Sequence, residues 1–322
     1  MSKKSNDSKT KTYLEYFNNS DLATKDINEV TTLLLDSHKT FNGRQFINDD
    51  ELKYVLPSDK KEIERSTLAH LLNRHRWKGN FSSPIKEKLD MCGATILDVG
   101  CGPGLRVIDM GLEYPYSSII GLDIDSSAFP PRGQYPSNVC FLTSNATHGV
   151  PFPPNTFDFI HMSMMWGAFN ETQWISIIKD LVRVLKHDGW IEFTEPDVTP
   201  KNPGKIQLLI HEYSRKACRE LKGVNIAIYE MIPKYLKAMD ELENINCITI
   251  DYPIGEWYGC FGKYAAENIK RVYQSFVFLP KYMGISNEEY IDLLNDFVKE
   301  ANEYKSYHFV CRYFARKKSS NY

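Results

Sequence analysis

The stretch ILDVGCGPG, residues 96–104, decides the fold that this sequence predicts. Apolar residues run into an acid and then into three alternating glycines, and Leu105, Ile108 and Leu112 follow at helical spacing. The pattern predicts a strand, a tight turn and a helix. Glycine is needed where the backbone turns at positive φ or where a ligand lies against it. The N-terminus of the following helix favours a negative group on that ligand.

The spacing of these glycines favours one ligand class over another. In the dinucleotide fingerprint the third glycine comes three residues after the second, but here Leu105 holds that position and the third glycine is Gly104. The spacing therefore disfavours NAD and FAD. Asp98, which ends the strand, could face an ammonium group or ordered water, and this suits an amino-acid-like ligand. An ordinary glycine-rich loop without a ligand is the alternative.

A second predicted strand, within residues 117–125, also ends in carboxylates. It lies about twenty residues beyond the glycines, where a doubly wound fold places the acid that binds ribose hydroxyls. Asp123 is therefore the predicted ribose ligand, whereas Asp125 fits the capping of the next turn.

These motifs resemble those of class I S-adenosylmethionine-dependent methyltransferases. The series runs Asp-x-Gly-x-Gly-x-Gly at 98–104, Gly-x-Asp at 121–123, Asn145-Ala146 ahead of Pro151-Phe152, and Phe157-Asp158. More narrowly, the chain is similar to the fungal LaeA-like group from about residue 43 to about residue 318. That likeness rests on Gly43-Arg44, Tyr54-x-Leu56-Pro57-x-Asp59, Glu62-x-x-Arg65, Glu113-Tyr114-Pro115, Asn138-Val139-x-Phe141, FDFIHM at 157–162, and Leu185-Lys186-x-x-Gly189-Trp190-Ile191-Glu192.

The resemblance implies a Rossmann-like α/β sheet with helices on both faces, and it implies S-adenosyl-L-methionine as the cofactor. It assigns cofactor binding to Asp98, Gly100, Cys101, Gly102, Gly104, Asp123, Ile124, Asn145, Ala146, His161 and Met162. The side chain of Asn145 and the backbone of Ala146 would lie against the adenine. Asn145 also fits a simple turn, which is the alternative for that residue.

The catalytic residue stays unassigned. Open α/β sheets bind ligands at the carboxyl ends of their strands, so residues 163–166 should face the methyl-transfer centre after the fourth strand. Trp166 could line that site or belong to the core. The carboxylates at the end of the fifth predicted strand are Glu192, Glu195 and Asp197. His161 and Glu195 are the weak candidates for a general base, and solvated loop carboxylates are the alternative, which we favour for Asp197.

The chain divides into five predicted segments. They are a polar tail at 1–25, a helical extension or lid at 26–90, the cofactor-binding core at 91–200, a helical insertion at 201–245, and the C-terminal part of the sheet with a helical hairpin at 246–318. The tail is too polar to bury the surface that folding requires. Apolar residues at helical steps predict the helices of the extension and include Val30, Leu33, Leu34, Ile63, Leu68, Leu71 and Leu72.

Three local features of the outer segments carry further expectations. Tyr54 and Arg44 could form a lid that contacts the methionine carboxylate, although packing of Tyr54 and solvation of Arg44 are the favoured alternative. Residues 255–259 could line an acceptor pocket. Residues 308–315 alternate like a last strand that could be antiparallel.

Composition limits the partners and the compartment. The 322 residues, 42% of them hydrophobic, fit one elaborated domain. No long apolar segment or secretory leader is visible in the sequence, so we expect no membrane partner. A net charge of −2 argues against nucleic acid. The seven cysteines form no Cys-x-x-Cys pair, which predicts reduced thiols in the cytoplasm or nucleus, and no metal site is expected.

The sequence leaves two functions open. The first is direct in-line transfer of a methyl group to an unidentified acceptor, either a small metabolite or a protein. The second is a regulatory module that binds the cofactor and acts through protein partners. The LaeA-like resemblance implies a fungal regulator of secondary metabolism or an enzyme on a small metabolite. A nucleotide-dependent oxidoreductase is opposed by the glycine spacing.

Overall fold

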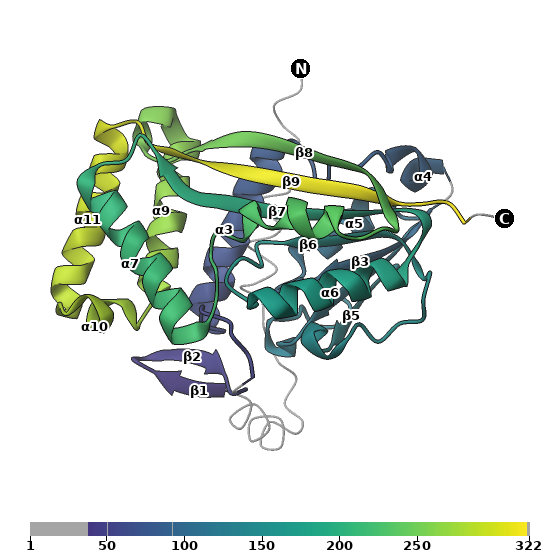
Figure 1. Cartoon of the computed structure of the whole chain (residues 1–322), viewed down its shortest axis with the longest axis horizontal. Coiled ribbons are helices and arrows are strands. Elements are labelled where there is room, and N and C mark those ends of the chain that lie inside the picture. The colour runs from purple at the N-terminus through teal and green to yellow at the C-terminus, as the bar shows by residue number, and fades with distance from the viewer. Residues whose placement is uncertain (1–37, 50, 92, 321–322) are drawn as a thin grey trace.

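A seven-stranded sheet with helices on both faces forms the centre of the molecule (Figure 1). The computed structural model describes residues 38–49, 51–91 and 93–320. Across the sheet the strands lie in the order β5-β4-β3-β6-β7-β9-β8. These strands are β3 Thr95–Val99, β4 Ser118–Asp123, β5 Val139–Thr143, β6 Phe157–Ser163, β7 Leu185–Lys201, β8 Leu242–Pro253 and β9 Tyr307–Lys317. Strands β3 to β7 pair in parallel, and β9 runs antiparallel between β7 and β8.

The helices divide between the sheet and a bundle beside it. They are α3 Lys60–Trp77, α4 Lys86–Met91, α5 Leu105–Glu113, α6 Glu171–Val184, α7 Lys205–Lys222, α8 Ile232–Lys237, α9 Gly259–Ser275, α10 Leu279–Met283 and α11 Asn287–Glu303. Helices α5 and α6 connect parallel strands of the sheet. In the bundle, α3 packs on α9, α9 on α11 and α11 on α7 (Figure 1).

The core lies between the middle of the sheet and α6. Strand β6 is buried over six of its seven residues and carries only three polar side chains, Asp158, His161 and Ser163, as expected for a parallel strand that is covered on both faces. From α6, Trp174, Ile178 and Leu181 are completely buried. They recur at helical steps and form one apolar face of the helix. Burying each such side chain stabilises the fold by roughly 1.5–3 kcal/mol relative to leaving it exposed.

The central elements confirm the prediction of a Rossmann-like sheet. The strand, glycine turn and helix at 95–113 form as expected, and the last strand is antiparallel. Asp59 caps α3 by accepting a hydrogen bond from the N–H of Glu62 at 3.0 Å. Ser286 and Glu289 form a capping box at the start of α11. These features were predictable because each depends on neighbouring residues.

One part of the N-terminal extension differs from the prediction of helices. Residues 38–47 form a hairpin, with β1 at His38–Phe41 and β2 at Arg44–Ile47. Its two turn residues, Asn42 and Gly43, have φ of 48° and 72°. An Asn-Gly turn of this kind matches the twist of a hairpin. The predicted tail at 1–25 and the helix that includes Val30, Leu33 and Leu34 lie outside the described residues.

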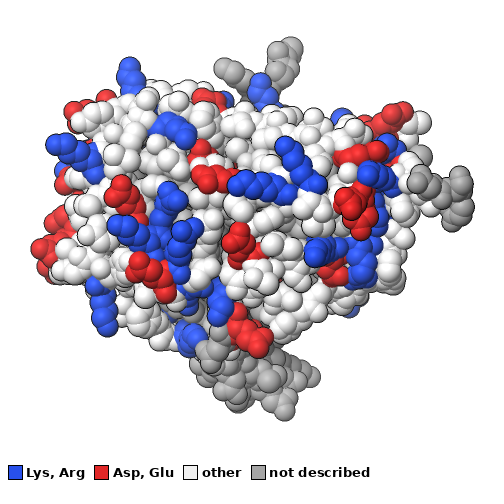
Figure 2. Space-filling view, in the orientation of Figure 1, with Lys and Arg blue, Asp and Glu red and all other residues white. Residues whose placement is uncertain are grey.

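The surface carries both signs of charge. Figure 2 shows acidic and basic side chains interspersed on one face of the molecule, in keeping with the net charge of −2. None of the helices in the described part of the chain has the length and apolar character needed to cross a bilayer.

Candidate functional site

A cavity of about 230 Å³ lies at the carboxyl ends of β3, β4 and β6, against α3. In open α/β sheets this is where ligands bind, because the connections leave the sheet in opposite directions there. The predicted cofactor residues that line it are Asp98, Gly100, Cys101, Gly102, Asp123, Ile124, Asn145 and Ala146. Three other predicted residues, Gly104, His161 and Met162, do not line it.

The three glycines of the turn serve different purposes. Gly100, Gly102 and Gly104 have φ of 68°, 52° and 74°, so all three use the left-handed region. A Cβ on Gly104 would lie 2.3 Å from the ring of Phe141, so this glycine permits close packing of helix on sheet. A Cβ on Gly102 would meet no atom within 4 Å. Gly102 therefore keeps space open at the cavity wall.

Asp123 connects the second strand to the glycine turn. One carboxylate oxygen accepts the N–H of Gly102 at 2.7 Å, and the other accepts the N–H of Asp125 at 3.0 Å. Burial raises the pKa of Asp123, and these backbone hydrogen bonds oppose the shift. Each oxygen keeps a lone pair for a further donor, as a hydroxyl would supply.

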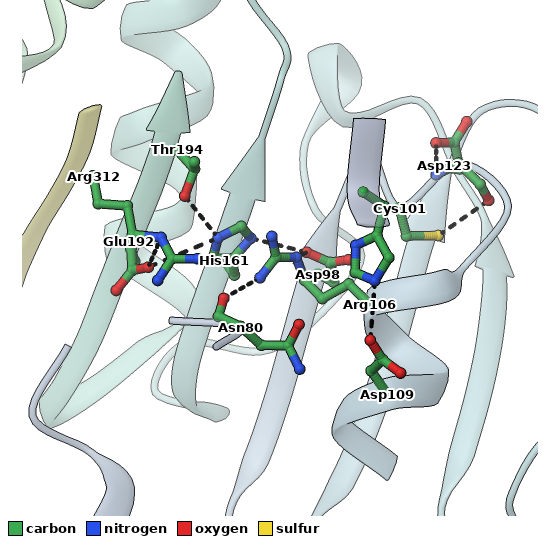
Figure 3. A network of polar contacts seen from close by, with 12 residues as sticks. Asn80, Asp98, Cys101, Arg106, Asp109, Asp123, His161, Glu192, Thr194 and Arg312 are labelled. Carbon is green, nitrogen blue, oxygen red and sulfur yellow. Dashed lines mark hydrogen bonds and ion pairs between the residues drawn. The ribbon is translucent and has the colours of Figure 1, made fainter. Parts of the chain in front are cut away.

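Asp98 is the second carboxylate of the cavity wall. Its Oδ1 lies 3.1 Å from Nδ1 of His161 and 3.7 Å from Nε of Arg106 (Figure 3). Burial raises the pKa of Asp98 to about 7, while Arg106 opposes the shift. The group therefore titrates near neutral pH, unlike an exposed aspartate.

His161 lies behind the cavity wall. Figure 3 shows its ring between Asp98 and Thr194, with Nε2 at 3.2 Å from the Thr194 hydroxyl. Only 1% of the residue is exposed, and burial, together with Arg106, holds its pKa well below the usual range. Met162 beside it is also fully buried. His161 therefore contacts Asp98 and Thr194 behind the cavity wall and does not line the cavity itself.

Glu195 holds the loop that follows β6. Its carboxylate accepts the N–H groups of Met165 at 2.8 Å and of Trp166 at 3.0 Å, and burial raises its pKa to about 8. Met164, in the same loop, has a φ of 59°, a strained conformation for a side-chain-bearing residue. Glu195 does not line the 230 Å³ cavity.

Two further carboxylates of β7, those of Glu192 and Asp197, are buried and paired. Glu192 accepts hydrogen bonds from the N–H groups of Ser82 and Ser83, and Arg312 lies 3.5 Å away (Figure 3). Asp197 pairs with Lys201 at 3.0 Å and is 6% exposed. The prediction that Asp197 is a solvated loop residue is therefore wrong, because β7 continues to Lys201 and keeps Asp197 in the sheet.

Asn145 caps a turn and also lies at the cavity. Its Oδ1 accepts the N–H of Thr147 at 3.0 Å, which caps a short turn, and the residue also lines the cavity. Tyr54 lines the cavity as well. Arg44 does not line it. Its guanidinium is mostly buried and paired with Asp59 at 2.5 Å, so the favoured expectation of a solvated Arg44 is wrong.

Helix α3 adds cavity residues that the sequence motifs did not assign to a site. They are Glu62, Ile63, Arg65, Ser66, Ala69, His70 and Asn73. Glu62 and Arg65 belong to a motif of the family resemblance, but for the other five the signal was helical periodicity, which does not reveal what a face packs against.

Comparisons with known proteins agree with this geometry. Residues 96–189 match a family model described as a methyltransferase domain. The N-methyltransferase verN of Clonostachys rogersoniana is 29% identical over 63% of this chain and 70% of that protein. The secondary metabolism regulator laeA of Aspergillus niger is 28% identical over 50% of this chain and 41% of that protein. The aligned region thus spans less than half of laeA.

One solved structure that the chain resembles is phosphoethanolamine N-methyltransferase 2 of Haemonchus contortus, in complex with S-adenosyl-L-methionine. It has a TM-score of 0.49 and 15% sequence identity, and the likeness covers 92% of this chain and 75% of that one.

The sheet order, the glycine turn and the matched family model define a class I S-adenosylmethionine-dependent methyltransferase domain. Its cofactor is S-adenosyl-L-methionine. Within this class, the chain is similar to laeA and to verN, at 28% and 29% identity, in keeping with the LaeA-like resemblance of its motifs. The cavity fits that cofactor, because Gly102 leaves room at the wall and two buried carboxylates, Asp98 and Asp123, face the same space.

Proposed function

We propose that the chain transfers a methyl group from S-adenosyl-L-methionine to an acceptor, either a small metabolite or a protein. We place the cofactor in the 230 Å³ cavity. The observation that carries this proposal is the convergence of the glycine turn and Asp123 on one cavity at the strand ends. The similarity to verN, which is an N-methyltransferase, supports transfer as the activity.

Each part of the cavity wall has a role in this proposal. Asp123 would bind the ribose hydroxyls, and Asp98, oriented by His161, would bind the ammonium group. Ile124, Asn145 and Ala146 would lie against the adenine. When bound, the cofactor supplies a methyl group on a sulfonium, which is already activated for transfer. The chain then has to align the acceptor and exclude water, and alignment alone can supply several orders of magnitude in rate.

A regulatory module that binds the cofactor is the second candidate. Two observations favour it: the residues predicted as bases, His161 and Glu195, do not line the cavity, and the relative laeA is named a regulator of secondary metabolism. Such a module would act through a protein partner. We place the protein in the cytoplasm or nucleus in either case.

Transfer of labelled methyl groups tests the two candidates. Purified chain and labelled S-adenosyl-L-methionine are incubated with an extract of the source cells, which is then separated into protein, nucleic-acid and small-molecule fractions. Label in one fraction, absent with Asp123→Ala, would identify an enzyme and its acceptor class. Cofactor binding without any transfer would favour the regulatory module.

Cofactor affinity is expected to fall as the pH drops below about 7. Binding of an ammonium group requires the Asp98 carboxylate, and burial raises the pKa of Asp98 to about 7. The other titratable groups around it are Arg106, Asp123 and His161, of which His161 stays neutral because its pKa is far below the usual range. Protonation of Asp98 should weaken binding by up to about tenfold per pH unit.

Calorimetry with S-adenosylhomocysteine between pH 5.5 and 8 measures this dependence. Asp98→Asn should bind more weakly at pH 8 and should lose most of the slope. An equal slope in the wild type and in Asp98→Asn would assign the titration to another group, such as Asp123.

A further inference from the structure

A second cavity, of about 110 Å³, adjoins the first. It lies among α3, the loop after β6, β7, α9 and β9. Four residues line both cavities, namely Arg65, Ala69, Asn73 and Met164. The two spaces are therefore neighbours, separated by side chains of α3 and of the loop that Glu195 holds.

The loop between the two cavities contains a residue with a strained backbone conformation. Met164 has a φ of 59°, and its N–H donates to the carbonyl of Thr194 at 2.9 Å. The next two N–H groups, of Met165 and Trp166, both donate to Glu195. A strained residue in a loop that three backbone hydrogen bonds hold in place is typical of a functional segment, because the fold must stabilise a conformation that the chain avoids elsewhere.

Aromatic and aliphatic side chains form most of the wall of the second cavity. The rings are those of Trp166, Tyr252, Tyr273 and Phe276, and the aliphatic residues include Ile226, Ile269, Val272 and Val310. Trp166 and Phe276 meet edge to face, with centroids 6.1 Å apart and an angle of 82° between the rings. Such a wall favours a flat, apolar ligand over a polar one.

Two hydrogen-bond acceptors interrupt this apolar wall. Nδ1 of His308 lies 3.1 Å from the carbonyl oxygen of Asp197, and a carbonyl only accepts, so the ring proton is on Nδ1. Nε2 then carries the lone pair, and it has no hydrogen-bond partner among the described residues. Burial lowers the pKa of His308 to about 4, which keeps the ring neutral. Oδ1 of Asn73 is also buried without a described partner.

The charges around the second cavity oppose a charged ligand. Its described lining includes Arg65 but no Asp or Glu. The guanidinium of Arg65 is already paired with Glu62 at 2.7 Å, and Nη1 lies 3.5 Å from Oδ1 of Asn268. The cavity thus offers unpaired acceptors without a free charge, and a neutral donor satisfies them best.

We propose that the second cavity is the acceptor site, and that the acceptor is an uncharged, ring-bearing small molecule whose N–H or O–H donates to Nε2 of His308. This inference rests on the proposed function, because it takes the first cavity as the cofactor site. A protein side chain without a ring would leave most of the aromatic wall unused.

Two matched probes test the recognition directly. Indole is an uncharged bicyclic ring with one N–H donor, and benzothiophene has nearly the same shape but no donor. Both are titrated by ligand-observed NMR into the full chain saturated with S-adenosylhomocysteine. The wild type should bind indole about tenfold more tightly than benzothiophene, as one hydrogen bond to a buried acceptor allows.

Two variants and one control complete the test. His308→Phe should reduce the ratio of the two affinities to about one, whereas His187→Phe, at an exposed histidine, should leave the ratio unchanged. Val272→Phe fills the second cavity and should abolish binding of both probes. Thermal melting checks that each variant is folded.

The outcomes separate the two proposals. A ratio near one in the wild type, or indole binding that survives both His308→Phe and Val272→Phe, would overturn the second-cavity inference and leave the proposed function intact. Failure of S-adenosylhomocysteine to bind the wild type, measured separately by calorimetry, would overturn the proposed function and the acceptor role with it.

Discussion

Asp123→Ala is expected to weaken the binding of S-adenosylhomocysteine by about 100-fold or more. The carboxylate lines the cavity, is buried, and already orients the N–H of Gly102. Each charge-assisted hydrogen bond to a ribose hydroxyl contributes roughly 1.5–3 kcal/mol, and about 1.4 kcal/mol corresponds to a factor of ten in affinity. Loss of two such bonds therefore accounts for the effect.

Calorimetry measures this loss, with thermal melting as the check on folding. Asp123→Asn keeps the shape of the side chain and should show most of the same loss. Asp188→Asn is the matched control, because Asp188 is exposed and pairs with Arg316 on the surface. It should bind like the wild type.

Gly102→Val should abolish binding of S-adenosylhomocysteine because the valine side chain would fill part of the cavity. Asp123→Ala, by contrast, removes a protein group that binds the cofactor. A side chain at Gly102 meets no protein atom within 4 Å, so it would project into open space at the cavity wall. Valine is strained at a φ of 52°, and Gly102→Asn provides a bulky residue that tolerates this backbone. Unchanged affinity in both the Asp123 and the Gly102 variants would remove the cavity as the cofactor site.

The second large effect is expected on stability, where Lys317→Met should reduce the free energy of unfolding by about 2–4 kcal/mol. Lys317 is 7% exposed, and its Nζ donates to the carbonyls of Val182 at 2.7 Å and Leu185 at 2.8 Å and to Oδ1 of Asn155 at 3.1 Å. The ammonium thereby binds the C-terminus of α6, where carbonyls have no partner within the helix. Methionine fills the same space but leaves these acceptors buried and unpaired.

Urea unfolding of Lys317→Met and Lys318→Met measures the difference between two adjacent lysines. Lys318 is exposed, so its variant should change the unfolding free energy by less than about 0.5 kcal/mol. Equal midpoints for the two variants would show that Lys317 does not stabilise the end of α6.

Local signals explain which elements could be predicted. The turn at 100–104 needs glycine at each positive φ, and the apolar face of α6 follows from spacing alone. The hairpin at 38–47 was missed, although Asn42-Gly43 is a strong turn signal, because the strands around it are short and exposed and lack an apolar alternation.

Local sequence signals also explain which residues of the site could be predicted and which could not. Asp98 and Asp123 could be predicted because each lies at the carboxyl end of its strand, within a local motif. The residues of the second cavity could not, since tertiary packing brings together Asn73, Trp166, Val272 and His308 from distant parts of the chain. The loop at 255–259, predicted as an acceptor wall, lines neither cavity. Helical periodicity identifies which face of a helix is buried, but it does not identify the element against which that face packs.

The position of β9 has a consequence for synthesis of the protein in the cell. This strand follows β3 to β8 in the chain but lies between β7 and β8 in the sheet. While the chain emerges from the ribosome, the edges of β7 and β8 that pair with β9 in the folded protein therefore stay unpaired. Unpaired strand edges can pair with other chains and cause aggregation. Release of a stalled chain before β9 has emerged would leave both edges exposed. We therefore expect the yield of folded protein to depend on chaperones that bind nascent chains.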